Sequence, residues 1–210
     1  MLCMLRLDHV LLAVADLDNA AARLLEEHGL DSAFGGEHAL GTANRIVPLG
    51  DAYVELIGVT DRAVAEANPF GSAVLSSIGN GDGLLGWAVA TDDIALTAKW
   101  IGSQVLRASR VRPDGVELRW RMAGIEGSMA DRSLPFFIQW DIDPEDHPSR
   151  MRVDHRVDVK GINEIEIVGS ATKVRNRVHG ESLPIRVVRG DVSGPVAVTI
   201  AASEGEIVLR

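Results

Sequence analysis

A histidine and a glutamate stand in mainly apolar stretches that have the composition of β-strands. His9 lies in "RLDHVLLAVA" and Glu55 lies in "AYVELIGV". A carboxylate in such a strand is costly without a partner, so Glu55 needs a partner group, a metal or a proton. His9 is the candidate partner, and the pair could do acid–base chemistry. The alternative is that His9 is a hydrogen-bonded histidine inside a sheet.

The stretch "GGEHALGTANRIVPLG" offers further polar groups. Thr42 and Asn44 fall two residues apart on a predicted strand and so face the same side, and His38 precedes them. These three side chains could fix a polar group of a ligand, or Thr42 and Asn44 could satisfy turn backbone instead. Gly35 and Gly36 allow a bulge or a close backbone approach.

Most of the aromatic side chains gather in the second module (residues 84–141): Trp87, Trp120, Phe136, Phe137 and Trp140. An apolar or ring-shaped ligand could pack on these side chains, with Trp87 as the candidate contact, although core packing also explains them. Arg119 lies on an alternating strand and could aim a guanidinium at a ligand carboxylate. No serine or cysteine stands in a nucleophile context, and the glycine turns lack the features of a phosphate-binding loop.

The elements that must position these groups repeat along the chain. Residues 5–59 read as a strand, a helix capped by Asp16 and ended by Gly29, and three further strands. The same order recurs with Asp92 as the cap and again with Ser170 as the cap, at nearly equal spacing along the chain. This spacing is too long for a solenoid repeat and is typical of tandem copies of a small βαβββ module.

The predicted class is therefore α+β, with five segments. They are a first βαβββ module (1–60), a helical linker (61–83), a second module (84–141), a polar, exposed connection (142–160) and a third, degenerate βαβββ unit (161–210). Which two modules pair with each other is left open by the sequence.

Composition and net charge limit the classes of partner that the protein is expected to bind. The chain has 210 residues and a formal net charge of −9, which disfavours binding to nucleic acid. It contains no apolar run long enough to span a membrane and no secretory signal, so we expect a cytoplasmic protein. Cys3 is the only cysteine, which excludes a disulfide framework, and we expect it to be a small hydrophobic residue near a frayed end.

Four stretches together resemble the glyoxalase-like domain of the vicinal oxygen chelate superfamily, over residues 5–141. They are "LDHVLLAVADLDNAAARL", "GGEHALGTANRIVPLGDAYVELIGV", "GLLGWAVATDDI" and "LPFFIQWD". The third unit matches only in its general pattern. The resemblance implies that paired modules curl their sheets into a cup, whose concave face holds a small-molecule site and frequently a divalent metal.

The resemblance also implies metal ligands on the first and last strands of each module. His9 and Glu55 match these positions in the first module. Counting back seven residues from Asp92 gives Leu85, which cannot ligate a metal, and the last-strand position of the second module is Gln139. The implied set is His9, Glu55 and Gln139 around zinc, nickel, manganese or iron, or else no metal is bound.

The other candidate ligands are weaker. The corresponding position in the third unit is Asn163, a poor ligand, while His38 or His147 could supply a missing imidazole. A set with one formal negative charge offsets a dication poorly, so tight metal binding is not expected.

Two functions from different classes follow, and a structural role is a third. In the first, the protein is a lyase or isomerase in which Glu55 or His9 is the general base beside an oxygen-bearing carbon, while Asn44 or a weakly held metal stabilises the oxyanion. In the second, the protein binds or sequesters a small molecule without catalysis. In the third, the C-terminal unit is a surface for forming a homodimer.

Overall fold

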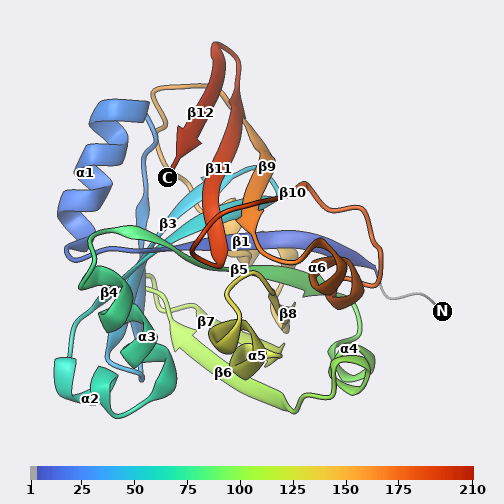
Figure 1. The fold of residues 1–210 in the computed structure, drawn as a ribbon. Coiled ribbons are helices and arrows are strands. Elements are labelled where there is room, and N and C mark those ends of the chain that lie inside the picture. The colour runs from blue at the N-terminus through green and yellow to red at the C-terminus, as the bar shows by residue number, and fades with distance from the viewer. Residues whose placement is uncertain (1–3) are drawn as a thin grey trace.

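The computed structural model describes residues 4–210, and Cys3 lies outside the described residues. Figure 1 shows a strongly curved sheet with a smaller sheet packed on its outer face. No helix within residues 4–210 is long and apolar enough to cross a membrane. The predicted α+β class with βαβββ modules is confirmed.

The large sheet joins the first two modules. Its eight strands run in the order β2-β3-β4-β1-β5-β8-β7-β6. In each module the first strand pairs in parallel with the last, and β1 and β5 lie antiparallel at the centre. The strands are β1 (Leu5–Ala13), β2 (Ala33–His38), β3 (Thr42–Leu49), β4 (Ala52–Val59), β5 (Gly83–Thr91), β6 (Val105–Val111), β7 (Glu117–Ala123) and β8 (Phe136–Trp140).

Capping side chains set the helix starts. Asp16 caps α1 (Leu17–His28) by accepting a hydrogen bond from the Asn19 backbone, and Gly29 ends that helix in a left-handed conformation. The cap of α4 (Ile94–Ile101) is Asp93, so the prediction of Asp92 was wrong by one residue. Both adjacent aspartates have the right chemistry, and only the backbone decides which of them caps. With Ser170 as the third cap, the three caps are equally spaced along the chain.

The third unit has the predicted order of elements but forms a sheet of its own. It comprises β9 (Val159–Val168), α6 (Ala171–Arg177), β10 (Ile185–Val188), β11 (Gly194–Ala202) and β12 (Gly205–Leu209). The strand order is β10-β9-β11-β12, so β9 pairs in parallel with the strand after the helix, unlike β1 and β5. Strand pairing, which depends on distant residues, therefore separates this unit from the other two.

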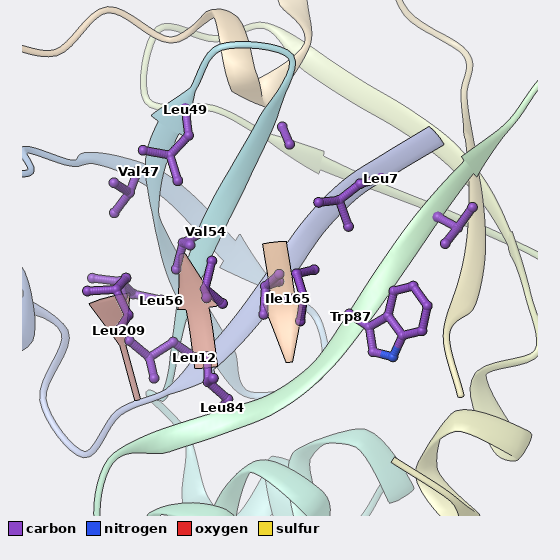
Figure 2. Close-up of a cluster of buried hydrophobic side chains, with 14 of the residues drawn as sticks. Leu7, Leu12, Val47, Leu49, Val54, Leu56, Leu84, Trp87, Ile165 and Leu209 are labelled. Carbon is purple, nitrogen blue, oxygen red and sulfur yellow. The ribbon is translucent and has the colours of Figure 1, made fainter. Parts of the chain in front are cut away.

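Alternation along the strands divides the apolar side chains between two faces of the large sheet. The outer face packs against α1 and the small sheet through one buried cluster, part of which Figure 2 shows; it includes Leu12, Val54, Trp87, Ile165 and Leu209. The inner face carries a second cluster, which includes Leu11, Ala88, Phe136 and Ile138. Between the first two modules, α2 (Arg62–Glu66) and α3 (Pro69–Ile78) follow, and α3 packs on this inner cluster through Val74.

The two edges of the large sheet approach each other, so the cup is nearly closed. Gly36 on β2 lies against the backbone of Val111 on β6, where a Cβ atom would come within 2.9 Å of the Val111 carbonyl oxygen. A short helix, α5 (Ile125–Ala130), precedes β8.

The connection after β8 covers part of the cup. We call residues 141–151 the strap; it holds two 3₁₀ turns, η1 (Pro144–Asp146) and η2 (Pro148–Arg150). The sequence predicts a polar, exposed connection, but Pro148 and Ser149 are buried. Arg150 pairs with Asp51 at the β3–β4 turn, which ties the strap to the first module.

Candidate functional site

A β-bulge near the start of β1 creates the centre of the site. Leu7 pairs with Val89 and His9 with Ala88, so Asp8 is an extra residue on β1. A bulge of this kind turns two successive side chains towards one side of a strand. The carboxylate of Asp8 therefore meets the ring of His9, with 2.6 Å between Oδ1 and Nδ1.

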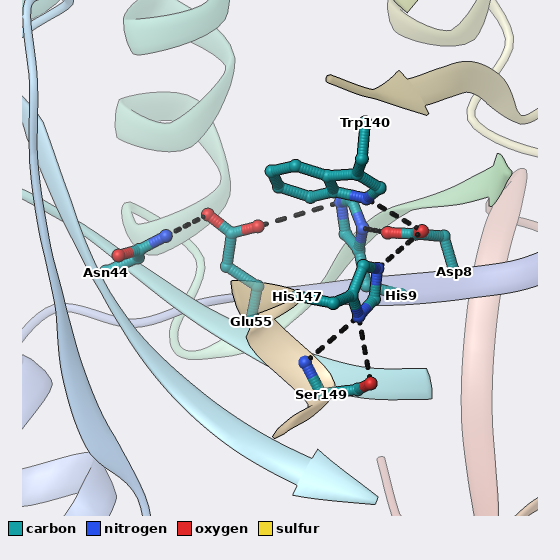
Figure 3. Close-up of polar contacts among 7 residues, drawn as sticks. All are labelled: Asp8, His9, Asn44, Glu55, Trp140, His147 and Ser149. Carbon is teal, nitrogen blue, oxygen red and sulfur yellow. Dashed lines mark hydrogen bonds and ion pairs between the residues drawn. The ribbon is translucent and has the colours of Figure 1, made fainter. Parts of the chain in front are cut away.

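His9 is held so that its other ring nitrogen faces Glu55. The distance from His9 Nε2 to Glu55 Oε2 is 3.6 Å, and the ring stacks on Tyr53 with 4.7 Å between centroids. A carboxylate on Nδ1 fixes both the orientation and the basicity of an imidazole. Figure 3 shows the resulting row of carboxylate, imidazole and carboxylate.

Glu55 is positioned by two residues from other strands. Its Oε1 accepts a hydrogen bond of 2.7 Å from Asn44 Nδ2 on β3, and Asn44 Oδ1 in turn accepts one from Arg110 Nη1 on β6. Only 8% of Glu55 is exposed. Gly35 permits this arrangement, because a Cβ atom there would overlap both Asn44 and Arg110.

Asp8 is the acceptor that several buried polar side chains share. Besides His9, its carboxylate accepts hydrogen bonds from Trp140 Nε1 at 3.0 Å and from His147 Nε2 of the strap at 3.3 Å. Burial by itself raises the pKa of Asp8, but the hydrogen bonds from His147 and His9 outweigh it and hold the pKa well below 3.8. Asp8 is therefore charged, and it attaches the strap to the centre of the site.

The tautomer of His147 follows from its partners. Its Nδ1 accepts a hydrogen bond of 3.2 Å from the Ser149 backbone, so its Nε2 carries the proton donated to Asp8 (Figure 3). The sequence proposed His147 as an imidazole for a metal, and the structure does bring it to the cluster. Both of its nitrogens are engaged in hydrogen bonds there.

His38 and Thr42 lie at the edge of the cluster and bond to each other, with 3.0 Å between Nδ1 and Oγ1. Burial lowers the pKa of His38, Glu55 raises it and Arg110 lowers it, with a net decrease. Burial also raises the pKa of Tyr53 well above 10, so this phenol stays protonated. Both rings are therefore neutral neighbours of Glu55.

Three predicted site residues are not brought to this cluster. Trp87 points to the outer face, where its indole donates to the Ser133 carbonyl oxygen. Arg119 is exposed and pairs with Glu117. The side-chain amide of Gln139 bonds to backbone atoms of Asp92 and Ile94 at the start of α4. Alternation places Gln139 on the opposite face from Phe136 and Ile138, which the spacing within "FFIQW" did not reveal.

The second module supplies no metal ligands at the equivalent positions. With Asp93 as the cap, the residue seven positions back is Gly86, so the predicted Leu85 was the wrong counterpart of His9. In the parallel register, Glu55 lies opposite Leu11 and Phe136 lies opposite Ala88, which makes Phe136 the counterpart of Glu55.

The donor set therefore does not fit a divalent metal. No group of three histidine, cysteine or carboxylate side chains that could hold a metal ion occurs among residues 4–210. Two donors, His9 and Glu55, fall short of the three protein ligands that a catalytic zinc site uses besides water.

Three contributors were not predicted as site residues from the sequence: Asp8, Tyr53 and Arg110. Trp140 was among the aromatic candidates, but its hydrogen bond to Asp8 was not predicted. Regular alternation would put Asp8 on the opposite face of β1 from His9, but the bulge turns Asp8 to the side of His9. Arg110 lies in the polar stretch "RASRVRPDG", which resembles a solvated strand edge. Its approach to Asn44 results from closure of the cup, for which the only sequence signal was the Gly35–Gly36 pair.

These features define a protein with paired βαβββ modules that form a cup, in which histidine and carboxylate side chains line the inner face of the sheet. The family model described as "Glyoxalase-like domain" matches residues 7–180, so the chain belongs to this family within the vicinal oxygen chelate superfamily. A search of curated proteins gives no match.

One solved structure shares the fold of this chain, and two others are similar over a smaller part of it. A hypothetical protein from Staphylococcus aureus is similar at a TM-score of 0.70 and 15% identity, with 91% of this chain and 88% of that chain covered. Methylmalonyl-CoA epimerase from Mycobacterium tuberculosis is similar at 0.47 and 18%, covering 67% and 89%. The epimerase from Streptomyces coelicolor, solved with 2-nitronate-propionyl-CoA, is similar at 0.46 and 20%, covering 64% and 95%.

Proposed function

We propose that the protein is a small-molecule lyase or isomerase in which Glu55 removes a proton from a carbon beside an oxygen-bearing carbon. The observation that carries this proposal is the state of the Glu55 carboxylate. One oxygen is fixed by Asn44, while the other stands 3.6 Å from His9, beyond hydrogen-bond distance. No buried side-chain polar atom in the described chain lacks a partner, so this second oxygen reaches accessible space. It is oriented, and free to accept a proton.

His9 is suited to assist this base. Asp8 holds its Nδ1, so its Nε2 points to the region where the Glu55 oxygen would meet a substrate. Protonated His9 can donate to the substrate oxygen on which negative charge develops. Asn44, which the sequence offered as an oxyanion donor, uses its amide on Glu55 and so acts as a positioning residue.

Exchange of substrate hydrogen with solvent deuterium tests the proposal. Carbonyl compounds that carry an acidic C–H bond would be incubated with the protein in D₂O and followed by proton NMR. We expect exchange above the buffer rate, and a decrease of about 10²-fold or more in Glu55→Gln, which preserves shape and the acceptor for Asn44. Arg119→Gln is the matched control, because Arg119 lies exposed on β7 and pairs only with Glu117 in the described chain. Equal exchange in Glu55→Gln and the wild type would exclude Glu55 as the base.

A binding or sequestering function is the second candidate, and the second module favours it. Gly86 and Phe136 stand where a symmetric site would carry polar groups, and the strap covers Asp8. A ligand that binds at the site without any exchange of its hydrogens would support sequestration over catalysis.

A further inference from the structure

Arg110 is a buried cation whose hydrogen-bonding capacity is mostly unused. Only 6% of the residue is exposed, and it projects from β6 towards the first module. Its Nη1 donates to Asn44 Oδ1. Within residues 4–210 this is the one hydrogen-bond partner of the Arg110 side chain, although a guanidinium has five N–H donors.

The unused donors reach accessible space beside the proposed base. No fully buried side-chain nitrogen or oxygen of the described residues is left without a partner, so the free nitrogens of Arg110 are not enclosed by protein. Through Asn44 they stand one residue away from the Glu55 carboxylate. A largely buried guanidinium with free donors at an accessible face is a site for an anionic oxygen.

We propose that Arg110 binds a carboxylate of the substrate and so places the substrate's acidic C–H bond next to Glu55. This inference rests on the proposed function, for which it names the substrate class: small carboxylic acids with an apolar body. Two N–H groups of a guanidinium match the two oxygens of a carboxylate, which fixes orientation as well as position.

The charge of the cluster favours a carboxylate over a phosphate. Asp8 and Glu55 already place two carboxylates in the cluster, which protonated His9 and Arg110 can at most balance. His38, whose pKa is lowered, adds no positive charge at neutral pH. A single-charged carboxylate pairs with Arg110, whereas a dianionic phosphate would add uncompensated negative charge in a site of low dielectric.

The neighbouring wall favours an apolar or aromatic body. Trp120 on β7 and Trp140 on β8 lie side by side, with ring centroids 5.4 Å apart, and both are only partly buried on the inner apolar cluster. Trp120 pairs with Ala108 across the β6–β7 register. Ala108 is two residues from Arg110 on β6, so Trp120 and Arg110 lie on the same face of the sheet. An aromatic ring can pack on these indoles while its carboxylate meets the guanidinium.

Binding of matched acids and amides tests the assignment. The probes are phenylacetate, 3-phenylpropanoate and phenylpyruvate, each with its neutral carboxamide, and phenyl phosphate, all titrated by calorimetry. We expect at least one acid to bind at least about 30-fold more tightly than its amide, and Arg110→Gln to lose about 30-fold or more of that affinity. Arg110→Lys should recover part of the loss by restoring the charge without the fork. Arg119→Gln should bind as the wild type does.

Each other outcome overturns the assignment. Equal binding of acid and amide, binding of no acid, tighter binding of phenyl phosphate, or full acid affinity in Arg110→Gln would do so. The acid–amide comparison uses the wild-type protein, so it decides even if Arg110→Gln does not fold. Loss of exchange in Glu55→Gln together with equal acid and amide binding would refute this inference alone. Arg110-dependent acid binding without exchange would refute only the catalytic function.

Discussion

Replacement of Asp8 by asparagine tests the idea that this carboxylate holds the site together. Asp8 is 1% exposed and accepts hydrogen bonds from His9, Trp140 and His147. Asparagine has the same shape, but one of its two polar atoms becomes a donor. At least one of the three donors then loses its acceptor, and the others lose a charged one.

The magnitude follows from these contacts. A hydrogen bond to a charged group contributes about 1.5–3 kcal/mol, and a buried donor left without a partner has a similar cost. One lost and two weakened bonds therefore give a loss of about 3 kcal/mol. For a chain of this size we expect Tm to fall by about 6–12 °C, measured by circular dichroism at pH 7. Asp114→Asn is the control. Asp114 has a partner too, Arg112, but its carboxylate is exposed, so the same substitution there leaves no buried donor without an acceptor.

The effect also has a defined pH dependence. The pKa of Asp8 is held below its ordinary 3.8 in the folded protein, because hydrogen bonds from His147 and His9 outweigh the opposing effect of burial. The stability that Asp8 contributes is therefore fully present above pH 3.8 and is lost as the pH falls towards the folded pKa. The Tm difference between the wild type and Asp8→Asn should shrink on acidification below about pH 4. A difference under about 2 °C at pH 7, or one that does not shrink, would refute the reasoning.

Three further outcomes are expected. Gly35→Ala should destabilise the protein by about 1–3 kcal/mol in urea unfolding, because the new Cβ would overlap Asn44 and Arg110, which position Glu55. Gly83→Ala is the control and should have little effect, because Gly83 faces open space. The hydrogen bond from Ser133 holds the pKa of Asp131 at about 2. Asp131→Asn should therefore lower the free energy of unfolding by about 1–2 kcal/mol at pH 7, and this difference from the wild type should shrink between about pH 4 and pH 2. A difference that stays constant over this range would contradict the prediction. Nickel, zinc or manganese in excess should change Tm by less than about 1 °C and leave no stoichiometric metal on the protein, whereas a shift of several degrees would show that the imidazole–carboxylate pair has further ligands.

The sequence predicted the parts of the fold that depend on local pattern. Strand alternation, the Asp16 cap and the Gly29 stop defined the first module, and the recurrence of a cap at nearly equal intervals defined the other two. The error at Asp92 and Asp93 was one residue, because neighbouring residues of the same type carry the same local signal. That error also moved the counterpart of His9 from Gly86 to Leu85.

The sequence by itself also indicated that Glu55 needs a partner and that His9 is the candidate, because a carboxylate in an apolar strand is costly alone. The tertiary structure alone decided what surrounds them. A bulge, invisible to alternation, turned Asp8 onto His9, and closure of the cup brought Arg110 against Asn44 from a strand 66 residues away in the chain. Those contacts depend on the register and curvature of the whole sheet, and both are set by the packing of distant strands and not by any short stretch of residues.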